Sequence, residues 1–90
     1  MTEKEVETRL ASLSGWQYDG VHIHQSFVFR DFSEAFAFLC RVALIAERLN
    51  HHPDWSGVYN RVVLKLRTHD ADGVTEKDFN FAEEVETLFG

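Results

Sequence analysis

Residues 47–78 read ERLNHHPDWSGVYNRVVLKLRTHDADGVTEKD, and this stretch decides the fold. It contains the end of a long helical pattern, two strand patterns and the beginning of a last helix. Pro53 is the only proline of the chain. A proline disfavours the helical conformation in the residue before it, here His52, so the preceding helix is expected to end near His51.

Two strands are expected after the proline. They cover residues 55–59 and 61–68, and in the second of them apolar and polar side chains alternate at the period of a strand. His69 is expected to end that strand, and residues 70–73 are expected to form a loop. The alternation predicts that one face of this part of the sheet is buried and that the other is wetter.

The last helix is expected to begin after Thr75. This residue is a suitable N-terminal cap, and Asp78 stands three positions later, where a carboxylate can bind the backbone of the cap. Val74 and Phe79 are placed to pack against each other across the cap. The expected apolar stripe of this helix comprises Phe79, Ala82, Val85, Leu88 and Phe89.

The longest helix is expected upstream, over residues 31–50, with Asp31 as its cap and Glu34 completing the capping pattern. The side chains expected to face the sheet are Phe32, Ala35, Phe36, Leu39, Val42, Ala43, Ala46 and Leu49, with Phe38 and Ile45 at one margin. A helix that is apolar over so much of its girth usually buries a second face, and the same helix of another subunit could cover it. Cys40 is interpreted as a small buried or half-buried residue of this helix.

The N-terminal part of the chain predicts a helix over residues 2–13, a short strand over 16–18, a turn at Asp19-Gly20 and a return strand over 21–30. The whole order is therefore α-β-β-α-β-β-α. It predicts an α+β fold in which a single domain, residues 1–90, contains a four-stranded antiparallel sheet with helices packed on one face. The other face of the sheet is expected to be solvated or covered by a partner.

Composition limits the possible functions. Ninety residues suffice for one domain, and the formal net charge of −6 argues against binding to a phosphate backbone, so no direct contact with nucleic acid is expected. No stretch is apolar enough to span a membrane, and the charged N-terminus has no apolar run of the kind found in signal peptides. The single cysteine excludes an internal disulfide, and we expect a cytoplasmic location.

Three of the five histidines, His51, His52 and His69, fall within the stretch that decides the fold. Histidine can give and take protons near neutral pH, so converging histidines suit a reaction that needs an acid and a base together, such as loss of water from a carbinolamine. Neighbouring side chains diverge, so one of the paired histidines could face the reacting centre while the other holds another edge of the substrate. Trp55 and Tyr59 could supply a flat apolar wall for a ring.

Other interpretations of these residues are open. Three imidazoles could bind zinc, but no H-x-x-x-H pair is present and adjacent histidines are poor chelators of one ion, so no metal is expected. His51 and His52 could simply cap the carbonyl groups of a helix end. A capping role explains Asp78 fully, and Glu47 could be a solvated helix residue.

The quoted stretch resembles the pterin-4a-carbinolamine dehydratases, which are also known as dimerisation cofactors of a homeodomain transcription factor. The resemblance rests on Glu47, the run His51-His52-Pro53, Tyr59, His69 and Asp78, and on the surrounding words HHPDW, VYNRV, LRTHD and GVTEKDF. It implies dehydration of 4a-hydroxytetrahydropterin to quinonoid dihydropterin without a metal or an organic cofactor.

The resemblance also implies a site and an assembly. His51 and His69 would exchange protons and His52 would orient the pterin, while Glu47, Pro53, Trp55, Tyr59 and Asp78 would contact the substrate. Members of the family are dimers or tetramers, which implies assembly through the long helix and a sheet edge. The chain departs from the family at Ser56-Gly57 and at Asp72, which replaces a common glycine in the loop.

A second function is open. The chain could be a non-catalytic module that binds a protein and stabilises the dimer of that partner, with the histidine pocket retained but incidental. The apolar excess on the long helix and the second role of the family support this alternative.

Overall fold

The computed structural model describes residues 1–89. Its elements follow the predicted order. They are α1 (Glu3–Leu10), β1 (Gln17–Tyr18), β2 (Ile23–Val28), α2 (Phe32–Leu49), β3 (Asp54–Val58), β4 (Arg61–Leu66), the 3-10 helix η1 (His69–Ala71) and α3 (Glu76–Phe89). The predicted α+β class and the α-β-β-α-β-β-α order are therefore confirmed.

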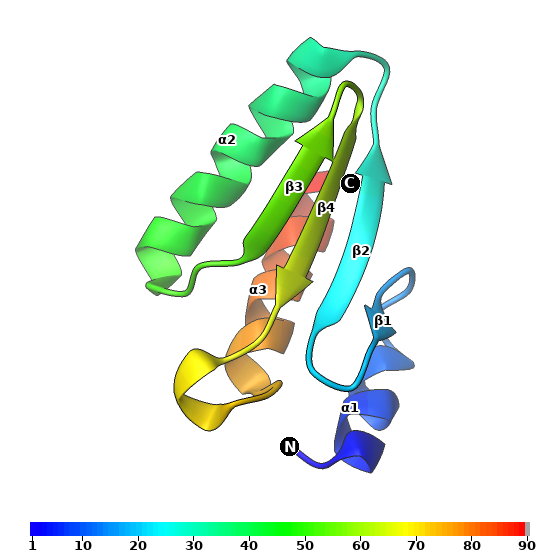
Figure 1. The fold of residues 1–90 in the computed structure, drawn as a ribbon, viewed down its shortest axis with the longest axis vertical. Helices are drawn as coiled ribbons and strands as arrows, with labels where there is room; N and C mark the ends of the chain where they lie inside the picture. The colour runs from blue at the N-terminus through cyan, green and yellow to red at the C-terminus, as the bar shows by residue number, and fades with distance from the viewer. Residues whose placement is uncertain (90) are drawn as a thin grey trace.

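The four strands form one antiparallel sheet in the order β1-β2-β4-β3, so β3 is an edge strand. Figure 1 shows α3 passing behind the sheet and α2 running alongside β3, while no helix of the described part of the chain covers the face of the sheet toward the viewer. The register places Ile23 opposite Leu66 and Phe27 opposite Val62. All four side chains are buried, which identifies the face of the sheet that the helices cover.

The core lies between this face and the helices, and α3 supplies Phe79, Phe81, Ala82 and Val85 to it. Phe38 of α2 packs against the rings of Phe27, Phe29 and Phe89. Large rings suit a chain of this size, because each can bury roughly 150–250 Å². Within residues 1–89, every helix is too short or too polar to cross a lipid bilayer.

The predicted sheet-facing stripe of α2 is confirmed for Ala35, Val42 and Ala46, which are buried, but it is wrong for its aromatic residues. Phe32 and Phe36 were expected to face the sheet but are 57% and 52% exposed, and Ala43 is exposed as well. Phe38, expected at the margin, is only 6% exposed. The apolar residues cover so much of this helix that its sequence pattern does not select one face, and packing against the rings around Phe38 makes the selection.

Four further expectations need correction. Cys40 is exposed rather than buried or half-buried. His69 does not end a strand, because β4 stops at Leu66 and His69 begins η1. Phe81 was left out of the stripe of α3 but is fully buried. The N-terminal helix is also shorter than predicted and ends at Leu10.

Candidate active site

His51 follows directly on the end of α2. Asn50 caps this helix in the left-handed conformation, with φ 51°, and its backbone then turns the chain away from the helix axis. The backbone N–H of His51 donates to the carbonyl of Ala46 at 3.1 Å. Its side chain is 11% exposed, and its Nε2 lies 2.5 Å from Oδ1 of Asp78 near the start of α3. The end of one helix and the beginning of another thus meet at an imidazole–carboxylate pair.

Asp78 is fully buried, and each of its oxygens has hydrogen-bond partners. Oδ2 accepts the backbone N–H of Thr75 and the hydroxyl of Thr68, both at 2.9 Å. The bond to Thr75 is the capping contact that the sequence predicts. Because capping occupies only Oδ2, Oδ1 is left to bind His51, and Asp78 has a role beyond capping.

The hydroxyl groups around Asp78 form a chain of hydrogen bonds that all donate in one direction, toward the carboxylate. Oγ1 of Thr75 accepts the backbone N–H of Lys77 at 3.3 Å and lies 2.5 Å from Oγ1 of Thr68. Thr68 uses its only hydroxyl proton for Asp78, so Thr75 must donate to Thr68. Since an ionised carboxylate only accepts, His51 donates through Nε2–H, and its Nδ1 is the ring nitrogen that Asp78 does not engage.

The ring of Phe81 completes the surroundings of His51. Its centroid lies 6.2 Å from that of the imidazole, in an edge-on arrangement. Phe81 follows Asp78 by three residues, so both side chains lie on the same face of α3. The helix therefore presents a carboxylate and an apolar ring to His51 one turn apart.

His52 points to a different neighbour. Its Nε2 lies 3.1 Å from Oε1 of Glu47, one turn back on α2, and both side chains are more than half exposed. Glu47 and His52 line a groove of about 380 Å³ between α2 and β3, together with Pro53 and Trp55. The rest of this groove is apolar and comprises Phe36, Leu39, Cys40, Val42, Ala43 and Ala46.

His69 lies on η1, directly after Thr68. Its Nδ1 lies 3.1 Å from a guanidinium nitrogen of Arg67, and the same guanidinium contacts Asp72 at 3.1 Å. Thr68 and Gly73 exchange backbone hydrogen bonds across this loop. Because Thr68 also binds Asp78, the segment that carries His69 is fastened to the carboxylate that holds His51.

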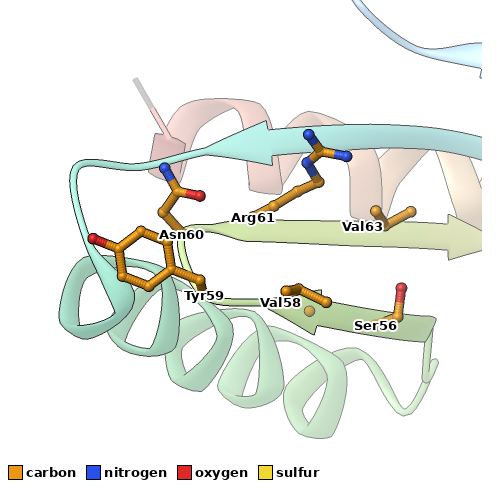
Figure 2. Close-up of a pocket in the computed structure, with 7 residues that line it drawn as sticks. Ser56, Val58, Tyr59, Asn60, Arg61 and Val63 are labelled. Atoms are coloured by element: carbon orange, nitrogen blue, oxygen red, sulfur yellow. The ribbon is translucent and has the colours of Figure 1, made fainter.

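Tyr59 lies apart from the histidines. It occupies the turn between β3 and β4, with φ 52°, whereas His52 and Pro53 precede the other end of β3. Tyr59 shares with Trp55 a second, smaller groove of about 120 Å³ beside α2. Figure 2 shows Tyr59 and Asn60 at the tip of the hairpin. Both line a surface hollow of about 530 Å³, and its lining includes no histidine. We therefore place the candidate site at the histidines rather than at this larger hollow.

The predicted site residues thus fall into three groups: His51 and Asp78 with His69 beside Thr68, the residues that line the groove beside β3, and Tyr59 at the hairpin. The structure brings His51 to Asp78 and brings His52, Glu47, Pro53 and Trp55 to one groove, whose lining does not include His51 or His69. The predicted roles of these residues in catalysis and substrate binding remain predictions. Within residues 1–89, no three histidine, cysteine, aspartate or glutamate side chains converge in the manner of a metal site.

Three neighbours of the predicted residues were not foreseen. Arg67 and Thr68 directly precede His69 in the sequence, but their partners lie beyond the strand and could not be predicted from its alternation. Phe81 could have been found, because its spacing of three from Asp78 places both on one face of a helix.

Comparison with known proteins gives consistent matches over most or all of the chain. A family model described as pterin 4 alpha carbinolamine dehydratase matches residues 1–88. A protein of Mesorhizobium japonicum is 50% identical over 92 residues, covering 100% of this chain and 94% of its own. One of Christiangramia forsetii is 46% identical over 88 residues, covering 98% and 91%. Both names assign these proteins provisionally as pterin-4-alpha-carbinolamine dehydratases.

Two solved structures have the same fold. The transcriptional coactivator/pterin dehydratase from Brucella melitensis superposes with a TM-score of 0.95 at 47% identity, over 100% of this chain and 98% of that one. A pterin dehydratase-like protein, described as a RuBisCO assembly factor in the alpha-carboxysome, gives a TM-score of 0.70 at 24% identity over 83% of this chain and 87% of that one. This second likeness concerns the fold alone.

Proposed function

The chain belongs to the pterin 4-alpha-carbinolamine dehydratase family, and from this membership we propose that it is a hydro-lyase acting on 4a-hydroxytetrahydropterin. The product would be quinonoid dihydropterin, and the reaction would serve the recycling of a pterin cofactor. One observation carries the proposal most: a histidine at the end of α2 is held by a fully buried carboxylate of α3.

The dehydration requires the transfer of one proton over a short distance, from N5 to the departing oxygen. N5 of the pterin loses its proton, the C4a–N5 double bond forms, the C4a–O bond breaks, and the departing oxygen must gain a proton to become water. His51 suits the first part, because the bond to Asp78 keeps the proton on Nε2 and leaves Nδ1 as a base. The resulting imidazolium can return the proton to the departing oxygen, so no net proton needs to be exchanged with solvent.

We propose that one edge of the flat heterocycle binds in the groove beside β3, which His52 lines but His51 does not. Its volume of about 380 Å³ falls in the range of small-ligand sites, about 300–1,000 Å³. Trp55 and Pro53 offer apolar surfaces, and the paired His52 and Glu47 add polar groups at one end. In this proposal His52 orients the substrate, and Tyr59 contacts it only through the adjoining groove that it shares with Trp55.

A direct assay of 4a-hydroxytetrahydropterin breakdown tests the activity. We expect the wild-type chain to exceed the spontaneous rate, and we expect His51→Ala and His69→Ala to lower kcat. His24→Ala is the matched control, because His24 is half-buried in β2 on the face without helices. The assay should be run with and without a chelator, because an effect of the chelator would point to a metal. Wild-type rates equal to the spontaneous rate would exclude the enzyme.

We also propose that the chain assembles with copies of itself through α2 and the edge strand β3. Phe32 and Phe36 of α2 and Trp55 of β3 are all more than half exposed, and they border the two adjoining grooves. Every residue of β3 is exposed, and among residues 1–89 no strand pairs with one side of it. Exposed apolar surface beside an unpaired strand edge is typical of an interface between subunits.

The same exposed surface favours the second candidate function, a module that binds a protein and stabilises the dimer of that partner. The two candidates differ in the histidines, which only the enzyme requires. If His51→Ala abolishes turnover and leaves the binding of protein partners unchanged, the chain is an enzyme. If the wild-type chain shows no turnover and the His51→Ala variant still binds protein partners, the chain is the binding module.

A further inference from the structure

A second charged network, separate from Asp78, holds His69. The guanidinium of Arg67 lies 3.1 Å from Nδ1 of His69 through one nitrogen and 3.1 Å from Oδ1 of Asp72 through another. Only 25% of the Arg67 side chain is exposed, whereas the Asp72 side chain is almost fully exposed. Arg67 is thus the inner member of the network, and it joins the segment that follows β4 to the end of η1.

The hydrogen-bonding capacity of arginine determines the state of this histidine. A guanidinium has five N–H donors and no acceptor, so Nδ1 of His69 must accept the hydrogen bond. An imidazole that accepts at Nδ1 carries its proton on Nε2 and is neutral. His51 differs from His69, because its partner is a carboxylate, which accepts a hydrogen bond from the protonated Nε2. This hydrogen bond can form with the neutral imidazole and with the imidazolium.

We infer that Arg67 is a positioning residue that fixes His69 as a neutral hydrogen-bond donor through Nε2–H. This inference rests on the proposed function and assigns roles within it. In the dehydration, Nδ1 of His51 takes the N5 proton, the C4a–O bond breaks, and the oxygen receives that proton from His51. His69 donates a hydrogen bond to the same oxygen while negative charge develops on it, as in an oxyanion hole. His69 therefore does not exchange a proton, contrary to the role that the family resemblance implies.

The local backbone explains why Arg67 can act in this way. The backbone N–H of Asp72 donates to the carbonyl of His69 at 3.1 Å, which closes the turn of η1. Asp72 has a left-handed backbone, with φ 52°, a conformation that aspartate tolerates better than most residues. The turn brings the carboxylate of Asp72 back over Arg67, and the planar fork of the guanidinium can then hold both neighbours at once.

Nitrogen NMR of the histidine side chains tests the tautomer directly. In the wild-type chain labelled with ¹⁵N-histidine, we expect His69 to show an unprotonated Nδ1 and a protonated Nε2. Arg67→Met removes every donor at similar length, so the two nitrogen signals should move toward each other as tautomers mix. Arg67→Gln retains an amide donor and should restore part of the difference. Arg30→Met is the matched control, because Arg30 is 78% exposed and pairs with Asp31 and Glu34 instead.

Kinetics of two His69 variants test the role in the reaction. Glutamine at position 69 can donate a hydrogen bond through its side-chain amide but cannot exchange a proton, whereas leucine can do neither. We expect His69→Gln to keep kcat within about tenfold of the wild-type value. We expect His69→Leu to lower kcat by a factor of roughly 10²–10³, the usual effect of removing one oxyanion donor. Arg67→Met should lower kcat by about twofold to tenfold with little change in KM, the effect of one hydrogen bond of ordinary net strength.

Two results would overturn the inference. The first is a His69 whose nitrogen signals are the same in the wild-type chain and in Arg67→Met. The second is a His69→Gln variant as slow as His69→Leu, because this result would require proton exchange by His69. A wild-type chain that fails to accelerate dehydration would overturn the proposed function instead, and the nitrogen signals would still decide whether Arg67 fixes His69.

Discussion

Nε2 of His51 lies 2.5 Å from Oδ1 of Asp78, and the two residues are 27 positions apart in the chain. Neither side chain has much access to water, because Asp78 is fully buried and His51 is 11% exposed. A buried carboxylate is stable only when its oxygens are paired, and here His51, Thr68 and Thr75 pair them. The orientation of the His51 imidazole and the stability of the fold therefore both depend on Asp78.

The first prediction concerns this carboxylate. Asp78→Asn keeps the size of the side chain but can place an amide N–H toward Nε2 of His51. This would favour the tautomer of His51 that carries its proton on Nδ1. We expect kcat to fall by about tenfold to hundredfold. This is part of the rate acceleration of about 10²–10⁴ that a positioned acid–base group contributes. Steady-state kinetics and the nitrogen signals of His51 check this. Asp70→Asn, an exposed carboxylate on η1, is the control.

The second prediction separates the hydroxyl of Thr68 from its bulk. Thr68→Val preserves the shape but leaves Oδ2 of Asp78 with only the N–H of Thr75. Loss of one hydrogen bond to a charged acceptor should lower the free energy of unfolding by about 1–3 kcal/mol, measured by urea denaturation. Thr68→Ser keeps the hydroxyl and should recover most of this loss. Equal stabilities of the valine variant and the wild type would show that the hydroxyl contributes nothing.

The third prediction concerns assembly. Phe36→Glu places a charge in the apolar groove beside Trp55, and we expect it to shift the chain toward the monomer in sedimentation velocity while circular dichroism remains native. Leu44→Glu is the control on the same helix, because Leu44 is 71% exposed and does not line either groove. If Phe36→Glu sediments like the wild type, the interface does not lie on this face.

Phe38 offers a contrast on the same helix. It is 6% exposed and touches the rings of Phe27, Phe29 and Phe89, so a charge there acts on the fold rather than on the assembly. We expect Phe38→Glu to cost more than the about 3–5 kcal/mol typical of removing a buried phenylalanine. This chain is short, so such a variant should be largely unfolded in circular dichroism at room temperature.

The fourth prediction concerns acid stability at the turn between β1 and β2. Partial burial acts to raise the pKa of Asp19, but the backbone N–H groups of His22 and Val21 and the nearby imidazoles outweigh it and hold this pKa below its ordinary value of 3.8. A lowered pKa in the folded state stabilises the fold above the unfolded value. This contribution is lost as the pH falls through the folded pKa, which lies below 3.8.

Asp19→Asn tests this sign. The amide oxygen can still accept the backbone N–H groups, but the side chain no longer titrates. We expect the wild type to exceed the variant in urea midpoint at pH 5, and we expect this difference to shrink steadily between pH 4 and pH 2. A difference that stays constant over this range would mean that ionisation of Asp19 does not contribute to folding.

Much of the fold could be predicted because its signals are local. The turn at Asp19-Gly20, the proline at position 53 and the cap at Asp31 fix where elements begin and end, and they depend only on neighbouring residues. The rotation of α2 could not be predicted in this way. Its apolar residues cover two faces, and the choice between Phe36 and Phe38 as the buried ring is made by the other aromatic rings of the core.

The sequence by itself determined the order of the elements, the antiparallel sheet and the identity of the three candidate histidines, because alternation, caps and turns act over a few residues. Tertiary structure alone decided which partner each histidine has. The capping pattern accounts for one oxygen of Asp78, and only the packing of α2 against α3 gives the other oxygen to His51. A charged group must find its partner in space when it is buried, so the chemistry of this site depends on contacts that no spacing along the chain encodes.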